Sequence, residues 1–220
     1  MTTSEDGGAV DDYACRFDFQ PGWVDLTLSE VTKASAKELA TEAVNRLNPL
    51  SLEIEKSAVY DDIVDRAVEL NEDNPILAGA YYSDSGVGLA SLRVDSYGEE
   101  GVSRPTAAEV QPLLLEWSNA EVASDPDITY LDLPVGPAVR VQAVLKAKRL
   151  LGFGRRLSEF VKYAVFPPGL NSLIVVTVTW EAVQQTEELT QLTDELVSTM
   201  RLVPLDAAGN EITAIPNPPK

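Results

Sequence analysis

Apolar and polar residues alternate most clearly near the end of the chain, at residues 172–180. Thr177 and Thr179 fall on one side of an extended chain there. The other side holds four apolar residues, namely Ile174, Val176, Val178 and Trp180. Successive side chains of a strand point to opposite faces, so this pattern predicts a strand with one buried face and one more polar face. Pro167-Pro168-Gly169 precedes it and predicts a turn from another strand.

The same reasoning predicts further strands earlier in the chain. Short runs with aromatic residues are found around Pro21-Gly22, which predicts a turn between two extended segments. Alternating runs and turn-forming residues predict strands at about 76–83, 87–95, 128–134, 138–148 and 158–166. Most of these strands follow one another along the chain, as the strands of consecutive hairpins do.

Helical spacing of apolar residues predicts three helices, at about 35–47, 58–71 and 186–202. Ser35-Ala-Lys-Glu38 and Thr106-Ala-Ala-Glu109 both have the form of a capping box, so each predicts a helix start. Pro112 falls inside the helix that would follow Thr106, where it should kink or restart it. The last helix carries an apolar stripe that can lie on the sheet, formed by Leu189, Leu192, Leu196 and Met200.

Consecutive hairpins with helices before and after them predict an antiparallel β-sheet covered by helices, which is an α+β sandwich. Residues 13–203 are predicted to form this single domain. Residues 1–12 carry four acids and no basic residue, which predicts a disordered lead-in. The four prolines within 204–220 predict an extended tail.

Two stretches resemble the Mog1/PsbP-like fold group, which includes actinobacterial lipoprotein-like relatives. The first is the early aromatic strand followed by Phe19-Gln-Pro21-Gly22-Trp23, and the second is the closing hairpin and amphipathic helix from Tyr163 to Leu202. The resemblance implies an α/β sandwich. Members of the group mostly act as binding or assembly modules of larger complexes and not as enzymes. The group has no shared catalytic motif, so the resemblance assigns no site residue.

The formal net charge of −18 argues against binding to nucleic acid or to anionic lipid, because both require a positive footprint. It favours a basic partner, or it serves only solubility. No apolar run reaches the roughly 18 residues that span a bilayer, so no membrane insertion is predicted. The first residues are acidic where a signal peptide would be basic, which predicts a cytoplasmic protein.

The residues present exclude several kinds of chemistry. The chain has no histidine, which rules out Ser–His, Cys–His and His–metal sites, and its single cysteine, Cys15, has no histidine base. Gly152-Phe-Gly154 lacks the third glycine of a dinucleotide fingerprint, and Asp125-Pro-Asp127 departs from a calcium loop at its sixth and twelfth positions. Adjacent acids such as Asp61-Asp62 do not face one another across a substrate. We therefore expect no enzyme, no cofactor and no metal.

Charge is distributed unevenly along the sequence. Residues 140–162 hold seven of the 17 basic residues and one acid, so they carry +6 and the rest of the chain carries −24. Apolar side chains lie between basic ones at the expected hairpin tip, and the candidate partner-binding residues are Arg149, Leu151, Phe153, Arg155 and Arg156. The alternative is that the apolar residues fold back while the basic ones pair with acidic helices of the same molecule.

These observations favour a non-catalytic protein-binding or assembly-accessory module of a larger complex. Its partner would be another protein, with basic proteins among the candidates, and self-association is open because residues 53–73 hold eight acids and two basic residues. One alternative is an acidic immunity-type or DNA-mimic inhibitor of a basic protein. The other is a domain that binds a small ligand between the sheet and the helices.

Overall fold

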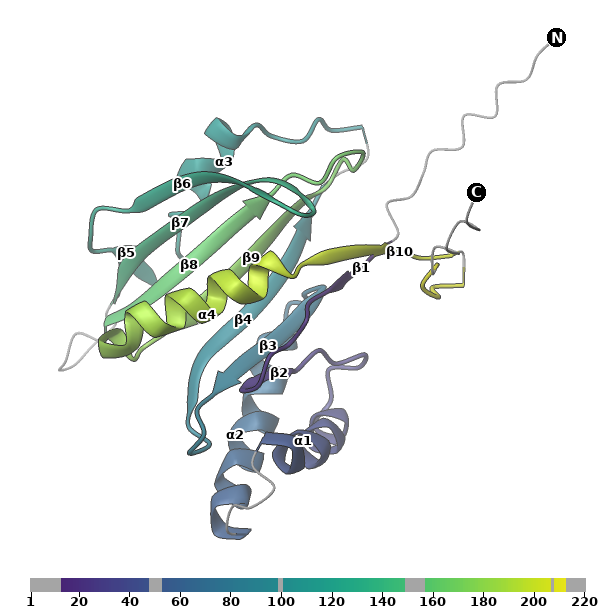
Figure 1. Cartoon of the computed structure of the whole chain (residues 1–220), viewed down its shortest axis with the longest axis vertical. Coiled ribbons are helices and arrows are strands. Elements are labelled where there is room, and N and C mark those ends of the chain that lie inside the picture. The colour runs from purple at the N-terminus through teal and green to yellow at the C-terminus, as the bar shows by residue number, and fades with distance from the viewer. Residues whose placement is uncertain (1–12, 48–52, 99–100, 149–156, 207, 213–220) are drawn as a thin grey trace, which may run out of the picture.

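The computed structural model describes residues 13–47, 53–98, 101–148, 157–206 and 208–212. Most of them form an eight-stranded antiparallel sheet with the strand order β2-β3-β4-β9-β8-β7-β5, in which β6 also pairs with β7 (Figure 1). The strands are β2 (Trp23–Asp25), β3 (Leu77–Tyr82), β4 (Gly88–Tyr97), β5 (Ala120–Val122), β6 (Asp127–Leu133), β7 (Gly136–Ala147), β8 (Leu157–Val165) and β9 (Leu173–Trp180). The predicted antiparallel α+β fold is confirmed, and β5 is a strand that the sequence did not predict.

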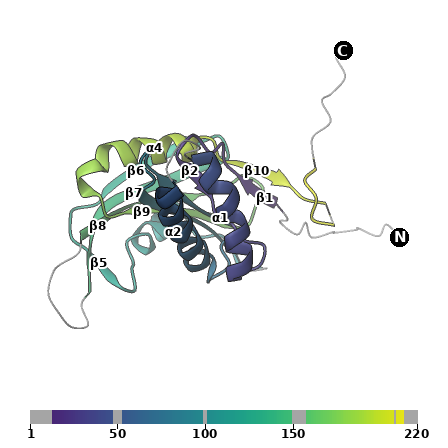
Figure 2. The same ribbon diagram turned by 90° about the horizontal axis from the view of Figure 1, so that it is seen from below.

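Helices lie on both faces of the sheet (Figure 2). One face packs against α4 (Thr186–Ser198), which follows the short helix η1 (Val183–Gln185). The opposite face packs against α1 (Lys33–Leu47) and α2 (Glu53–Asn71) near β2 and β3, and against α3 (Ala107–Leu113) near β7. Each group of helices has its own cluster of buried apolar residues, so the core is divided into three parts.

Of the two capping boxes that the sequence predicted, one is present and the other is not. Thr106 and Glu109 form the predicted capping box at α3, and Pro112 is inside this helix, which ends one residue later. Helix α1 begins before the predicted Ser35: Thr32 Oγ1 accepts a hydrogen bond from the Ser35 N–H at 3.1 Å. The box predicted at Ser35 is therefore wrong, because Thr32 already satisfies one of the unpaired N–H groups of the first turn.

The two ends of the described chain meet in a second, two-stranded sheet. Strand β1 (Tyr13–Arg16) pairs with β10 (Arg201–Pro204), so the predicted last helix ends at Ser198 and its final residues form a strand. Beyond β10 the chain turns, because Leu205 bridges Glu211 and the Asp206 side chain accepts from the N–H of Asn210 at 2.9 Å. The described residues 205–206 and 208–212 of the predicted tail are thus held by these contacts, and residues 207 and 213–220 lie outside the described part.

The turn before β2 depends on its glycine. Gly22 has φ +91°, and a Cβ atom there would lie 2.5 Å from Tyr81 Cε2 and 2.9 Å from the Tyr82 carbonyl oxygen. A side chain at this position would be strained by both the backbone angle and the contact. Gly22 therefore sets how closely β2 approaches β3, which is where Trp23 enters the core with 6% of its surface exposed.

Candidate functional site

The helices leave the middle of one sheet face uncovered. Between α2 and the segment 117–120 lies an open groove with a volume of about 1070 Å³. Ser91 of β4 and Thr179 of β9 are paired neighbours in the sheet and form part of its floor. These residues lie on the more polar side of their strands, as the sequence predicted for Thr179. We call this surface the sheet groove.

Ion pairs hold the charged side chains along one wall of the sheet groove. Arg66 of α2 contacts Asp62 through two nitrogen atoms at 3.2 Å, and it donates to the Ser91 hydroxyl at 2.8 Å. Arg93 of β4 donates from Nε to both Asp95 oxygens at 2.9 Å and from Nη1 to Asp73 at 2.8 Å. These paired groups are oriented before any partner arrives.

Trp117 is part of the opposite wall, and Lys162 packs against its ring. The Trp117 ring centroid is 5.0 Å from that of Phe160, and Lys162 Nζ lies 4.0 Å from the Trp117 centroid. An ammonium group over an indole face is attracted by the ring quadrupole. The buried Nε1 of Trp117 meets no acceptor among the described residues, so packing and not hydrogen bonding fixes this ring.

Burial changes the protonation of Lys162. It lowers the pKa of this amine to about 8, while the negative charges of Asp95 and Glu116 oppose the change. Among the described residues, the hydrogen bond that the amine donates is a long one, 3.5 Å, to the Glu116 carbonyl oxygen. Next to the Trp117 wall of the sheet groove there is therefore a cation that is poorly solvated and weakly bonded near neutral pH.

A second polar cluster lies on the other face, between α4 and the sheet. Arg140 Nε donates to the Tyr163 hydroxyl at 3.2 Å and to Asp194 Oδ1 at 3.1 Å, and Tyr163 itself donates to Asp194. Burial, followed by this hydrogen bond, raises the Tyr163 pKa. Gln142 donates to Glu159, which also accepts from Thr186. The groups satisfy one another, so this cluster anchors α4 and offers no open position for a substrate.

The single cysteine is not arranged for chemistry. Cys15 is buried at 3% exposure, and this burial raises its thiol pKa to about 12. A thiol that stays protonated is a poor nucleophile. Within the described ranges, no three Asp, Glu, Cys or His side chains come together to hold a metal ion. None of the described helices is long and apolar enough to cross a membrane.

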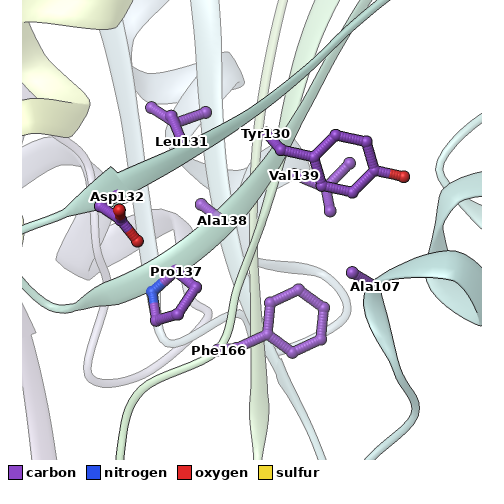
Figure 3. Close-up of a pocket in the computed structure, with 8 residues that line it drawn as sticks. All are labelled: Ala107, Tyr130, Leu131, Asp132, Pro137, Ala138, Val139 and Phe166. Atoms are coloured by element: carbon purple, nitrogen blue, oxygen red, sulfur yellow. The ribbon is translucent and has the colours of Figure 1, made fainter.

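A smaller hollow of about 220 Å³ lies between α3 and the β6–β7 hairpin. Figure 3 shows the rings of Tyr130, Pro137 and Phe166 and the methyl group of Ala107 around it. The Tyr130 hydroxyl donates to Gln111 of α3 at 2.8 Å, which fixes the ring across the gap. Asp132 is the only charged residue of its lining among the described residues. We call this hollow the β6 pocket.

The five residues predicted to bind a partner, Arg149, Leu151, Phe153, Arg155 and Arg156, lie outside the described residues, so that prediction stays open. The described members of the same basic segment have partners within the molecule. Lys146 contacts Glu121 at 3.1 Å, and Lys148 donates to the Trp117 carbonyl at 3.2 Å. Arg140 contacts Asp194 of helix α4, whereas the partners of Lys146 and Lys148 do not lie on helices, so the alternative of pairing with acidic helices also stays open.

Sequence reasoning missed the sheet groove because its walls come from distant segments. One signal for the contact beside the groove was present in β8, because Lys162 lies between the apolar residues Phe160 and Ala164 on one face of the strand. A cation at such a position must find compensation nearby. Nothing in the sequence identified Trp117 as that partner.

No protein-family model matches the chain, and no curated protein matches it. The solution structure of cyanobacterial PsbP (CyanoP) from Synechocystis sp. PCC 6803 is similar at 9% identity, with a TM-score of 0.42, over 89% of this chain and 95% of that one. The Ran-binding protein Mog1p of Saccharomyces cerevisiae is similar at 11% identity, with a TM-score of 0.30, over 52% and 68%. The expected likeness to the Mog1/PsbP-like fold is therefore found, and it concerns the fold alone.

Proposed function

We propose that the protein is a non-catalytic binding module whose sheet groove receives a polypeptide segment of a partner protein. The observation that supports this most directly is the open groove of about 1070 Å³ on a face that is otherwise covered by helices. A typical small-molecule pocket of roughly 300–1,000 Å³ encloses most of its ligand. The sheet groove is as large as such pockets but open along the sheet.

The chemistry of the groove favours a polypeptide over other ligands. Its wall and floor carry both signs of charge at close spacing, with Arg66 beside Asp62 and Arg93 beside Asp95. Neither a polyanion nor a polycation complements such a surface, whereas a polypeptide brings both donors and acceptors. The existing ion pairs already restrict these side chains, so binding would cost less side-chain entropy.

The test fills the groove without changing the core. Thr179 is partly exposed on the groove floor, so Thr179→Arg places a long side chain there. Thr41→Arg on the exposed side of α1 adds the same charge elsewhere. Both variants and the wild type are used to capture partners from a lysate of the source organism. We expect a partner that Thr179→Arg loses and Thr41→Arg retains. Equal capture by all three proteins would refute the groove as the binding surface.

A second candidate, an inhibitor of a basic protein, is supported by α2. Asp61 and Asp65 are exposed on this helix, and Glu72 is exposed directly after it. An inhibitor that occupies a basic site would bind through these acids and would be released by salt, because exposed charges are screened. Changing the three acids to their amides should then abolish capture while Thr179→Arg leaves it intact. The opposite result would favour the sheet groove.

A further inference from the structure

Strand β6 forms a free edge of the large sheet. It pairs with β7 along its whole length, from Asp127 opposite Gln142 to Leu133 opposite Gly136. Among the described residues no strand lies on its other side, and Figure 1 shows β6 at the border of the sheet. The outward N–H and C=O groups of such a strand can pair with an added strand.

The β6 pocket opens on one face of this edge. Residues directly opposite each other in an antiparallel pair point to the same face, so Tyr130 and Asp132 share the face of Val139 and Pro137. All four line the pocket. A residue of an added strand that pairs directly with Asp132 would also point to this face. A long side chain at that position would extend past Asp132 toward the pocket.

The pocket suits a long basic side chain. Its walls are mainly apolar, with the rings of Tyr130 and Phe166 on two sides (Figure 3), and they can hold the aliphatic stem of an arginine or lysine. Asp132 is exposed, and no described cation pairs with it. The nearby Arg104, 5.4 Å from the Phe166 centroid, is held by the carbonyl oxygens of Pro167 and Ser172.

The charge of β6 also disfavours one occupant, namely a second copy of the same strand. The strand carries Asp127 and Asp132 and no basic residue. Asp127 contacts Arg140 at 3.6 Å but its side chain is 71% exposed. A second copy of the same strand would bring like charges to this edge, which is unfavourable and is a known way to prevent edge-to-edge association. A basic strand would meet complementary charges.

We infer that the β6 edge and the β6 pocket form a strand-addition site for an extended basic segment of a partner protein. The segment pairs with β6 through its backbone, and one arginine or lysine lays its stem in the pocket with its charged end at Asp132. The inference rests on the proposed function and adds a second surface, with a defined chemistry, to the same binding module.

The probe is a fluorescent seven-residue peptide of alternating valine and arginine, which matches the seven residues of β6. A second peptide has the same side chains and charge but carries N-methyl groups on alternate backbone nitrogens. We expect the first peptide to bind in a fluorescence anisotropy titration and to slow amide hydrogen exchange across residues 127–133. The N-methylated peptide should do neither, because it cannot complete the strand pairing.

Two variants of the full chain test the pocket. Asp132→Asn should weaken binding of the peptide about fivefold, as expected for an exposed ion pair. Ala107→Phe should weaken binding of the peptide more than Asp132→Asn does, because the added ring would fill the pocket. Glu42→Gln on α1 makes the same charge change on an exposed residue of another element and should leave the affinity within about a factor of 1.5, since surface charges beyond a Debye length are screened.

The possible results separate strand addition from general attraction to a protein of net charge −18. Equal binding of both peptides, equal effects of Asp132→Asn and Glu42→Gln, or no binding at all would each overturn the inference. The groove is tested independently. A natural partner lost with Thr179→Arg but kept with Asp132→Asn, together with an unprotected β6, would leave the proposed function standing and remove only the strand-addition site.

Discussion

The two faces of the large sheet are built differently. On one face α4 lies over strands whose apolar side chains are almost completely buried, and Leu189, Leu196 and Met200 are each at most 1% exposed. On the other face, α2 and α3 cover separate areas and leave a polar strip that includes Thr177 and Thr179. No helix covers this strip, and its side chains are polar. This difference teaches that one face is a closed core, whereas the other leaves polar side chains accessible.

The largest effect should come from the closed face. Leu196→Ala removes a side chain that is 1% exposed at the centre of the α4 contact. We expect a loss of about 3–5 kcal/mol in the free energy of unfolding, because such a substitution leaves a cavity in a packed core. Urea denaturation measures it. A loss below about 1 kcal/mol would mean that α4 is not firmly packed on the sheet.

The polar cluster on the same face should come next. Arg140→Met removes the cation between Tyr163 and Asp194, and the Arg140 side chain is 10% exposed. We expect a loss of about 2–3 kcal/mol, since the buried Tyr163 hydroxyl and the half-exposed Asp194 carboxylate would lose their charged partner. Thermal unfolding at neutral pH checks this prediction. Unchanged stability would show that packing of the methionine side chain stabilises the fold as much as the Arg140 ion pair does.

On the partly uncovered face, the Lys162 amine should make stability depend on pH. Its folded pKa of about 8 is below the unfolded value, so the unfolded chain binds more protons between about pH 8 and pH 10.4. Wild-type stability relative to Lys162→Met should therefore rise across this range. We expect a rise of about 1 kcal/mol, which is reduced from the full shift because solvent screens this partly exposed group. Parallel denaturation curves of the two proteins at pH 7 and pH 10 test it, and a constant difference would contradict it.

The smallest effect should be in the polar strip of the uncovered face. Thr177→Ala changes a partly exposed side chain beside the paired strand positions Arg93 and Lys162. We expect a change below about 0.5 kcal/mol, as for most surface substitutions. Comparison with Leu196→Ala in the same denaturation series sharpens the contrast between the faces. A loss as large as that of Leu196→Ala would show that the polar strip is part of the core.

Much of the fold could be predicted because strand and helix periodicity are local properties. The buried side of β9 and the stripe of α4 follow directly from the spacing of their apolar residues. The boundaries of α1 and α4 were predicted less well. Thr32 provides the cap that Ser35 was expected to form, and the residues after Ser198 gain more from pairing with β1 than from continuing the helix.

The candidate site was far less predictable. Thr177 and Thr179 were correctly placed on the more polar side of their strand, and this side forms part of the uncovered face. The contact of Trp117 with Lys162 joins positions 45 residues apart, and that of Arg66 with Ser91 joins positions 25 residues apart. Side-chain contacts between separate elements depend on how those elements pack, which no single stretch of sequence specifies.

By itself the sequence determined the α+β class, the two-sided strands, the capping box at Thr106 and the absence of histidine chemistry. Each of these depends on residue types or on spacing within one element. Only the tertiary structure decided which strip of the sheet stays uncovered, that β6 has an unpaired edge, and that Asp132 lies at an apolar pocket. These features arise because helices of fixed length cover a wide sheet incompletely, and the places they leave open depend on long-range packing.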